Sequence, residues 1–292
     1  MATDERRARE FFRSAVADYD AVHYGQRSLM SVRLDRVVGA VRRLGLPEGA
    51  EALDVGCGPG YLVGELCRQG LLTWGVDTSG QMLAQAERRF TEAGLRPRPR
   101  LQLAQAQALP FQDESFDLVC STGMIEYLRE DGPTLEEFWR VLRPGGHVVL
   151  TITNFWSHAG LFDWLVEWAK RQEWLLAPFN RIWVARGNAA IRPRAFGIRR
   201  HRPAQIRASL CDARFELGAS EFFYMLPWPH PFDRLLPGAT ARLGARLEGL
   251  CSGPLGTLAE GLVLTARKPG VSAGLERAKL GRPVTGFMNH PG

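Results

Sequence analysis

Three glycines stand at alternate positions, Gly56, Gly58 and Gly60, directly after the apolar run 51–55. A helical pattern follows from Tyr61. Glycine at such a turn allows a positive φ and lets a ligand approach the backbone without meeting a Cβ. A turn from a strand into a helix N-terminus, at the carboxyl edge of a sheet, is where α/β proteins bind nucleotides. The turn therefore predicts a site for a nucleotide-like ligand.

A carboxylate is expected beside this turn. The segment 72–76 reads as the second strand and is followed by Asp77, while Asp54 precedes the first glycine by two positions. A carboxylate at the end of the second strand can accept hydrogen bonds from both hydroxyls of a ribose. It could instead cap the next helix, a role that Thr78 and Ser79 could also fill. The upstream glycines favour the ribose role for Asp77.

The glycine spacing G-x-G-x-G differs from the dinucleotide fingerprint G-x-G-x-x-G. With the preceding acid, it resembles motif I of the class I S-adenosylmethionine (SAM)-dependent methyltransferases. Ala-Gln-Ala-Gln-Ala-Leu-Pro-Phe at 104–111 and Ser-Phe-Asp-Leu-Val at 115–119 resemble that family's G-D-A-x-x-L-P-F and S-F-D-x-V segments. Arg-Val-Leu-Arg-Pro-Gly-Gly at 140–146 resembles the turn before its fifth strand, to which we assign no chemistry. The resemblance, to small-molecule members, covers about residues 8–154 and 203–267.

The resemblance implies SAM as the methyl donor and S-adenosylhomocysteine as the product. An acidic residue contacts the adenine amino group in the family, and Gln105 takes its place here, where its carbonyl can still accept from that group. An aromatic residue near the opening helix covers the cofactor in relatives, and Tyr19 and Tyr24 are the candidates; Tyr19 could equally lie on the buried face of its own helix. The predicted cofactor-binding residues are Tyr19, Tyr24, Asp54, Gly56, Cys57, Gly58, Gly60, Asp77, Thr78, Met82, Gln105, Ala106, Ser121 and Thr122.

Methyl transfer from a sulfonium needs no covalent residue, because the methyl carbon is already electrophilic. The protein must place a nucleophile in line, exclude water and take up a proton where required. The segment 121–127 lines the methionine end of the cofactor in relatives, and it ends in Ile-Glu-Tyr where the family often has Leu-Glu-His, so a base that some relatives use is missing. The candidates for proton uptake are Glu126, Tyr127, His158 and Glu167. No metal site is predicted.

Alternating helices and strands must position these groups. The expected order is helix 4–20, helix 28–44, strand 51–55, helix 61–69, strand 72–76, helix 79–93, strand 99–103, loop 104–114, strand 115–120, helix 134–142, strand 146–152, helix 203–213, strand 214–224 and strand 261–267. Such alternation implies parallel βαβ units. The predicted fold class is α/β, a doubly wound, seven-stranded, mostly parallel Rossmann-like sheet with a helical cap insertion.

The segment 155–202 interrupts this regularity. It carries five tryptophans, and an amphipathic helix is expected from Leu161 to Trp168. A further amphipathic helix is expected at about 232–251. We predict N-terminal helices over the cofactor site (1–45), a SAM-binding core (46–154 and 203–269), a substrate cap (155–202 and about 225–255) and a flexible tail (270–292). The expected pocket residues, each of which could instead belong to a second small core, are Phe155, Trp156, Phe162, Trp183, Phe223, Tyr224 and Trp228.

The positive charge of the chain narrows the class of methyl acceptor. The 292 residues carry a net charge of +6, and residues 181–202 hold seven arginines and no acid. Arginines facing the pocket would indicate a phosphate or carboxylate on a hydrophobic acceptor. Arginines facing outward could hold an anionic membrane surface or form a solvated loop. The acceptor class is therefore a prenyl diphosphate, a lipid, a quinone or a polyketide-type product.

The sequence also bears on two alternative functions and on the location of the protein. Nucleic-acid methylation fits the charge, but the chain lacks an Asn-Pro-Pro-Tyr-type tetrapeptide and a Pro-Cys nucleophile. A SAM-binding protein without transferase activity is a third possibility. The charged segment 1–10 lacks the apolar stretch of a signal peptide, no apolar run reaches transmembrane length, and five cysteines show no C-x-x-C pair. We therefore expect a cytoplasmic enzyme with a small-molecule partner.

Overall fold

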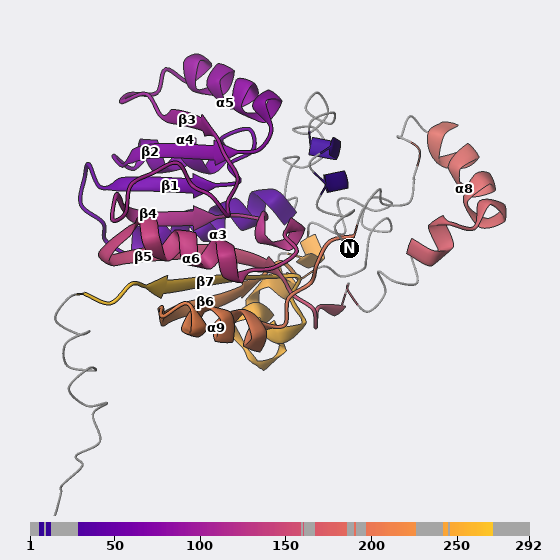
Figure 1. Cartoon of the computed structure of the whole chain (residues 1–292). Helices are drawn as coiled ribbons and strands as arrows, with labels where there is room; N and C mark the ends of the chain where they lie inside the picture. The colour runs from indigo at the N-terminus through magenta and orange to yellow at the C-terminus, as the bar shows by residue number, and fades with distance from the viewer. Residues whose placement is uncertain are drawn as a thin grey trace, which may run out of the picture.

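Seven strands form a single sheet in the order β3-β2-β1-β4-β5-β7-β6 (Figure 1). The computed structural model describes residues 6–8, 10–12, 29–158, 160, 167–185, 190, 197–225, 242–244 and 246–270. The strands are β1 (Glu51–Val55), β2 (Leu72–Asp77), β3 (Arg100–Leu103), β4 (Phe116–Ser121), β5 (Leu142–Thr153), β6 (Glu216–Phe223) and β7 (Gly261–Arg267). All neighbours pair in parallel except β7, which is antiparallel to β5 and β6. The predicted fold class is confirmed.

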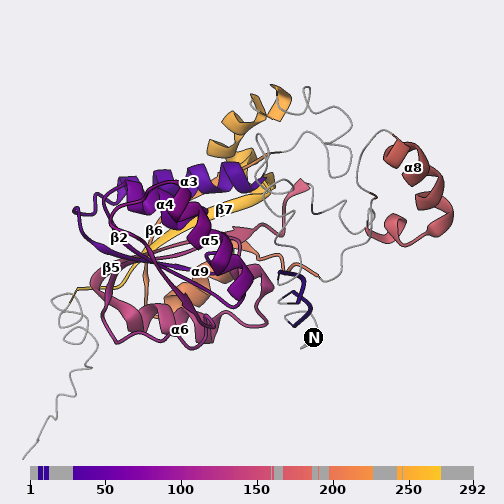
Figure 2. The same cartoon turned by 90° about the horizontal axis from the view of Figure 1, so that it is seen from above.

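The helices cover both faces of the sheet, as the sequence pattern requires for a doubly wound fold. The described helices are α3 (Leu29–Arg43), α4 (Tyr61–Arg68), α5 (Gly80–Glu92), α6 (Gly132–Val141), α8 (Glu173–Ala185) and α9 (Pro203–Asp212), with short 3₁₀ turns η1 (Ile125–Tyr127), η3 (Glu248–Ser252) and η4 (Pro254–Leu258). Of these helices, α8 stands away from the sheet (Figure 1). Apolar residues of α3 and α4 pack on one face, and those of α6 and α9 pack on the other (Figure 2). None of the described helices is long and apolar enough to cross a membrane.

The order of the strands places a crevice at one edge of the sheet. The chain runs outward from β1 to β2 and β3, then returns to β4 on the other side of β1. Ligands of open α/β sheets bind at such a reversal, outside the carboxyl ends of the strands. Figure 1 shows the described residues of 6–12 beyond this edge, and α8 stands further out on the same side.

One predicted turn lies inside a strand. We expected Pro-Gly-Gly at 144–146 to precede the fifth strand, but β5 already begins at Leu142. Phe116 pairs with Leu142 and Leu118 with His147, so the intervening residues of β5 bulge out of the ladder. A bulge accommodates extra residues without ending the pairing, which the spacing of proline and glycine does not reveal.

The helix α8 was not predicted as a separate element, because the segment 155–202 showed no regular pattern beyond the helix expected at 161–168. Pro178 lies inside the helix. Of the expected helix 161–168, the positions 161–166 lie outside the described residues. The described part of the expected helix 232–251 is helical at 242–244 and continues as the 3₁₀ turn η3. The predicted tail, 270–292, lies outside the described residues from 271 onward.

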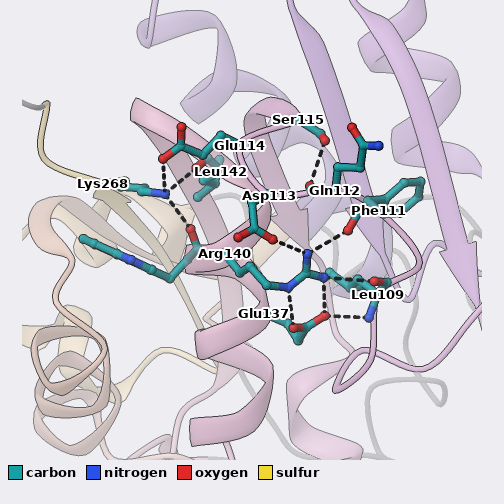
Figure 3. A network of polar contacts seen from close by, with 11 residues as sticks. Leu109, Phe111, Gln112, Asp113, Glu114, Ser115, Glu137, Arg140, Leu142 and Lys268 are labelled. Atoms are coloured by element: carbon teal, nitrogen blue, oxygen red, sulfur yellow. Dashed lines mark hydrogen bonds and ion pairs between the residues drawn. The ribbon is translucent and has the colours of Figure 1, made fainter.

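Arg140 joins α6 to the loop before β4 (Figure 3). Its guanidinium donates to the carbonyls of Leu109 and Phe111 at 3.0 and 2.7 Å. It also pairs with Glu137 and Asp113, each at 2.8 Å. Glu137 in turn accepts from the backbone N–H of Leu109 at 2.7 Å. This network fixes the loop whose first residues reach the crevice.

Candidate cofactor and active site

A cavity of about 1140 Å³, counted together with the open space at its mouth, lies at the carboxyl edge of β1, β2 and β4. Its wall combines the glycine turn after β1, the end of β2, the loop after β3 and the loop after β4 with residues of the N-terminal helix and of α3. The predicted cofactor residues on this wall are Asp54, Gly56, Cys57, Gly58, Asp77, Thr78, Met82, Ala106 and Thr122. Residues 54 to 122 thus converge because their strands are neighbours in the sheet.

The glycine turn has the backbone that its residue types suggest. Gly56 has φ of +77° and Gly60 has φ of +78°. A Cβ on Gly56 would lie 2.3 Å from Cγ of Met124, so the loop after β4 could not pack there. A Cβ on Gly60 would lie 2.6 Å from the ring of Phe90 and 2.8 Å from Cβ of Ala86. Gly60 therefore allows α4 to pack on α5, and it is not part of the cavity wall.

Asp77 lies on the wall and holds the turn at the same time. Its Oδ2 accepts from the backbone N–H of Gly58 at 2.9 Å, and its Oδ1 accepts from that of Ser79 at 2.8 Å. Burial raises the pKa of Asp77, while these backbone hydrogen bonds oppose the rise. The cap of α5 is Ser79, whose hydroxyl accepts from the N–H of Met82 at 3.3 Å. Asp77 therefore keeps lone pairs for a ligand hydroxyl.

Two buried oxygen atoms on the wall have no hydrogen-bond partner among the described residues, Oδ1 of Asp54 and Oγ1 of Thr122. Burial, together with the nearby charge of Asp77, raises the pKa of Asp54 to about 8. A buried carboxylate without a partner is costly, and a positive charge beside it offsets that cost. SAM carries a sulfonium and an amino group, so this carboxylate fits a ligand of that charge. Asp77 likewise fits its ribose.

Other predicted cofactor residues lie elsewhere. Gln105 is exposed, and Gln107 is on the wall in its place, beside Ala104 and Ala106. The expected contact from Gln105 to adenine is thus not formed by its side chain in this arrangement. Ser121 is buried within the sheet and does not reach the cavity. Tyr19 and Tyr24 lie outside the described residues.

The N-terminal helix supplies an aromatic cover through Phe12. This ring lies on the wall and packs edge-to-face on Tyr127, with ring centroids 5.1 Å apart. The hydroxyl of Ser79 donates to the carbonyl of Phe12 at 3.4 Å. Phe12 was not among the predicted cofactor residues, for which Tyr19 and Tyr24 were the aromatic candidates. The signal for it was the Phe11–Phe12 pair on the apolar face of the opening helix. Met30 and Leu34, one turn apart on α3, were missed too.

Of the four candidates for proton uptake, only Tyr127 is on the described wall. Glu126 is buried against Arg33 and Thr153. His158 is hydrogen-bonded through Nδ1 to the carbonyl of Leu258 at 2.8 Å. Glu167 pairs with Lys170 at 2.6 Å. The last three therefore serve other contacts.

The predicted substrate residues separate into two groups. Phe223 is fully buried between the sheet and the α3 and α4 helices, and Tyr224 packs against the same cluster. Both are core residues. Phe155 and Trp156, directly after β5, are 40% and 50% exposed, with ring centroids 5.0 Å apart. Phe162, Trp228 and the side chain of Trp183 lie outside what the structure describes.

Three arginines at the end of the arginine-rich segment 181–202 make different contacts. Arg199 forms an ion pair with Asp131, and Arg200 pairs with Glu260 at 3.1 Å. Burial would raise the pKa of Asp131, but His201 and Arg199 together hold it below the ordinary value. Arg202 instead lies over the rings of Phe155 and Trp156, 5.0 and 5.5 Å from their centroids. Among the described residues Arg202 has no carboxylate partner.

Comparisons with known proteins agree with this geometry. A family model described as a methyltransferase domain matches residues 53–150. A malonyl-[acyl-carrier protein] O-methyltransferase of Erwinia billingiae is 34% identical over 46% of this chain and 49% of its own length. The first curated relatives are matched over only 27% to 50% of their lengths.

Solved structures show the same fold at low sequence identity. The [4+2]-cyclase SpnF aligns with a TM-score of 0.61 at 21% identity, covering 91% of this chain and 96% of that one. Magnesium protoporphyrin IX methyltransferase from Synechocystis, solved with bound S-adenosylhomocysteine, aligns with a TM-score of 0.57 at 16% identity, covering 91% and 99%.

Proposed function

Because the chain belongs to the class I SAM-dependent methyltransferases, we propose that it transfers a methyl group from SAM to an apolar small molecule that carries an anionic group. The proposal rests on two features that lie at or beyond the carboxyl edge of the sheet. The cavity holds the carboxylates of Asp54 and Asp77, and the segment that follows β5 exposes large apolar side chains with Arg202 stacked on two of them.

The cavity residues would bind and orient the donor. Asp77 would accept from the ribose hydroxyls, and the carboxylate of Asp54 would face its positive charge. When bound, SAM supplies a methyl carbon that is already electrophilic. Phe12 and Tyr127 would exclude water from above, which strengthens every charge interaction inside. Tyr127, on the same wall, is our candidate for proton uptake from an acceptor, and it would act as a base in its phenolate form.

The acceptor class follows from the exposed side chains beyond β5. Large apolar residues rarely gather on a surface without a ligand or partner. The exposed members between 155 and 184 are Phe155, Trp156, Trp168, Trp174, Leu175, Phe179, Ile182 and Val184. They lie beyond the carboxyl edge of the sheet, as Figure 1 shows for α8. An apolar acceptor would cover this surface and enter the cavity from it.

Arg202 adds the anionic group to the proposed acceptor. Its guanidinium lies over two aromatic rings, and five N–H donors in a plane suit a phosphate or carboxylate. Arg199 and Arg200 already pair with Asp131 and Glu260. Arg202, stacked on two of the exposed rings, is therefore the arginine that we assign to the acceptor; Arg181 of α8 is also exposed, but among the described residues it stacks on no ring.

The test measures formation of S-adenosylhomocysteine with pairs of apolar acceptors that differ only in a diphosphate or carboxylate. We expect turnover with the anionic member, and an Arg202→Ala variant should lose about tenfold in kcat/KM for it alone. Arg214→Ala is the matched control, since Arg214 lies 4.8 Å from the Trp139 ring centroid, away from the cavity. Equal turnover of both acceptors by the wild type would overturn the anionic anchor. SAM binding without product from these acceptors or from RNA would overturn methyl transfer.

Asp54 predicts how SAM affinity depends on pH. With a pKa of about 8, Asp54 is mostly protonated at neutral pH in the protein without ligand. A cationic ligand binds the carboxylate form, so binding releases a proton below pH 8. SAM affinity should therefore rise between pH 6 and pH 8, by up to about tenfold per unit, and then level off. Calorimetry in two buffers of different ionisation enthalpy measures both affinity and proton release.

Asp54→Asn is the control for this pH profile, because it retains the shape and reports only the titration of the ligand itself. The variant should bind SAM more weakly, and its affinity should not rise between pH 6 and pH 8.

A second measurement is the pH dependence of the stability of the folded protein. The raised pKa means that the folded protein binds more protons than the unfolded chain between about 3.8 and about 8. Without ligand, the wild type should lose stability across this range as pH rises, and the variant should not. Identical profiles would contradict the assignment.

The position of Phe12 predicts how much the N-terminal helix contributes to SAM affinity. Phe12→Ala removes a ring on the wall and its contact with Tyr127, each worth on the order of 1 kcal/mol, so SAM affinity should fall about tenfold. Phe11→Ala is the matched control, because Phe11 packs on Phe12 but is not on the wall. Calorimetric titration with SAM measures the affinity of both variants. An equal loss of affinity in both would assign the effect to the packing of the helix and not to the ring of Phe12 over the cavity.

A further inference from the structure

We propose that the buried trio Arg33, Glu126 and Thr153 is a positioning device that aligns the wall residues of α3 with those of the loop after β4 for turnover. None of the three is on the described wall of the cavity. They would act through their neighbours, so they are positioning residues. The inference deepens the proposed function and rests on it for its kinetic part.

The trio joins three elements that are distant in the sequence through mutual side-chain contacts. Arg33 of α3 is 1% exposed and Glu126 of η1 is 3% exposed. Nη1 of Arg33 lies 3.4 Å from Oε1 of Glu126, and Nη2 donates to Oγ1 of Thr153 at 3.5 Å. Thr153, at the end of β5, donates to Oε2 of Glu126 at 2.7 Å. Each side chain therefore touches the other two.

The loop after β4 is shaped around this set. Gly123 has φ of +68°, and a Cβ there would lie 2.1 Å from Nη1 of Arg33, so a larger residue would have to displace the buried guanidinium. The N–H of Gly123 donates to Oγ1 of Thr151 at 2.9 Å, which ties the loop to β5 as well. The buried guanidinium thus sets the path of a loop whose other residues face the cavity.

The neighbours of the trio are wall residues. On α3, Met30 and Leu34 flank Arg33, and on the loop Met124 and Tyr127 flank Glu126. One contact therefore fixes two parts of the wall relative to each other. The polar donor-binding groups, Asp54 and Asp77, come from β1 and β2 and are not attached to the trio.

The cap segment reaches the same loop. The backbone N–H of Arg199 donates to the carbonyl of Glu126 at 3.0 Å, and its guanidinium donates to the carbonyl of Ile125 at 3.4 Å. Its ion-pair partner is Asp131, just beyond the loop. The proposed acceptor surface and Tyr127 are thereby connected through the η1 turn.

Stability alone does not account for such a pair. Replacing a buried ion pair with apolar residues of similar size is often neutral or stabilising, whereas removing one partner is strongly destabilising. Buried polar groups fix the position of neighbouring elements in some proteins, and this is the role proposed for the trio. The two roles predict different results for a fully apolar trio.

The experiment compares the wild type with the triple variant Arg33→Met/Glu126→Leu/Thr153→Val. We expect the triple variant to keep its melting temperature and to bind SAM within about threefold of the wild type. It should lose at least tenfold in kcat, and hydrogen exchange of amides 123–128 should be faster without ligand. Thr153→Ser keeps the hydroxyl and should retain wild-type kcat. The control Arg143→Met/Asp117→Leu removes a pair at 2.6 Å near the amino end of β4 and should change neither readout.

The possible outcomes distinguish the positioning role from a purely structural one. Unchanged exchange and unchanged kcat in a folded triple variant would overturn the positioning role. If the triple variant does not fold, Thr153→Val against Thr153→Ser carries the same comparison, and equal kcat and exchange would overturn it. A wild type that binds SAM but methylates no acceptor would sink the proposed function, while hydrogen exchange would still decide whether the trio holds the loop.

Discussion

Gly56→Ala should weaken SAM binding by at least about 100-fold, which corresponds to about 2.7 kcal/mol. The new Cβ would lie 2.3 Å from Cγ and 2.6 Å from Cβ of Met124, so the loop after β4 must move. A φ of +77° adds strain that alanine meets and glycine does not. The displaced loop carries Thr122 and Tyr127, both on the wall. Isothermal titration with SAM or S-adenosylhomocysteine measures the loss.

Gly49→Ala is the matched control for backbone strain. Gly49 has φ of +79°, nearly the value of Gly56, and a Cβ there would have no atom within 4 Å. This variant should lose on the order of 1 kcal/mol of stability and bind SAM as the wild type does. Should both glycine variants weaken binding alike, the close approach of Met124 would not be the cause.

Asp77→Ala should also weaken SAM binding by about 100-fold or more. Two ribose hydroxyls donating to a carboxylate contribute about 1.5–3 kcal/mol each. The variant also frees the N–H groups of Gly58 and Ser79, which Asp77 holds at 2.9 and 2.8 Å. Affinity for a 2′-deoxy analogue of S-adenosylhomocysteine separates the two effects: the wild type should discriminate against the analogue, and the variant should not.

Asp117→Ala controls for the loss of a structural carboxylate. Asp117 accepts from the N–H of Glu51 at 2.9 Å and pairs with Arg143 at 2.6 Å, near the amino end of β4. Its replacement should lower the melting temperature and leave SAM affinity unchanged. If Asp77→Ala still discriminates against the deoxy analogue, another residue binds the ribose.

The glycine turn and the alternating elements could be predicted because they are local signals. The apolar run before Gly56 and the helical pattern after Gly60 fix a strand, a turn and a helix in order. Parallel pairing then brings strand ends together whatever their separation along the chain. For this reason the pattern places Asp54 and Asp77 at the same edge of the sheet, whereas Thr122 was predicted from the family resemblance of the segment 121–127.

Side-chain direction in crowded segments could not be predicted. Two phenylalanines end β6 and Tyr224 follows the strand. Alternate residues of a strand face opposite sides, so the sequence does not show that Phe223 faces the core. The same ambiguity of direction separates Gln105 from Gln107. The contact between Glu126 and Arg33 joins residues 93 positions apart. No local spacing indicates such a pair.

The wall of the cavity has a thermodynamic consequence. Asp54, Asp77 and Thr122 stand together only after β1, β2 and β4 have paired, so the unfolded chain has no equivalent site. A ligand that binds only the folded state adds stability by mass action, about 2.7 kcal/mol at a concentration of one hundred times its Kd. Heating the protein with SAM, and then with SAM and each trial compound, can therefore rank ligands without any knowledge of the product. Because the site exists only when the three strands are paired, the rise in melting temperature reports how tightly a ligand binds.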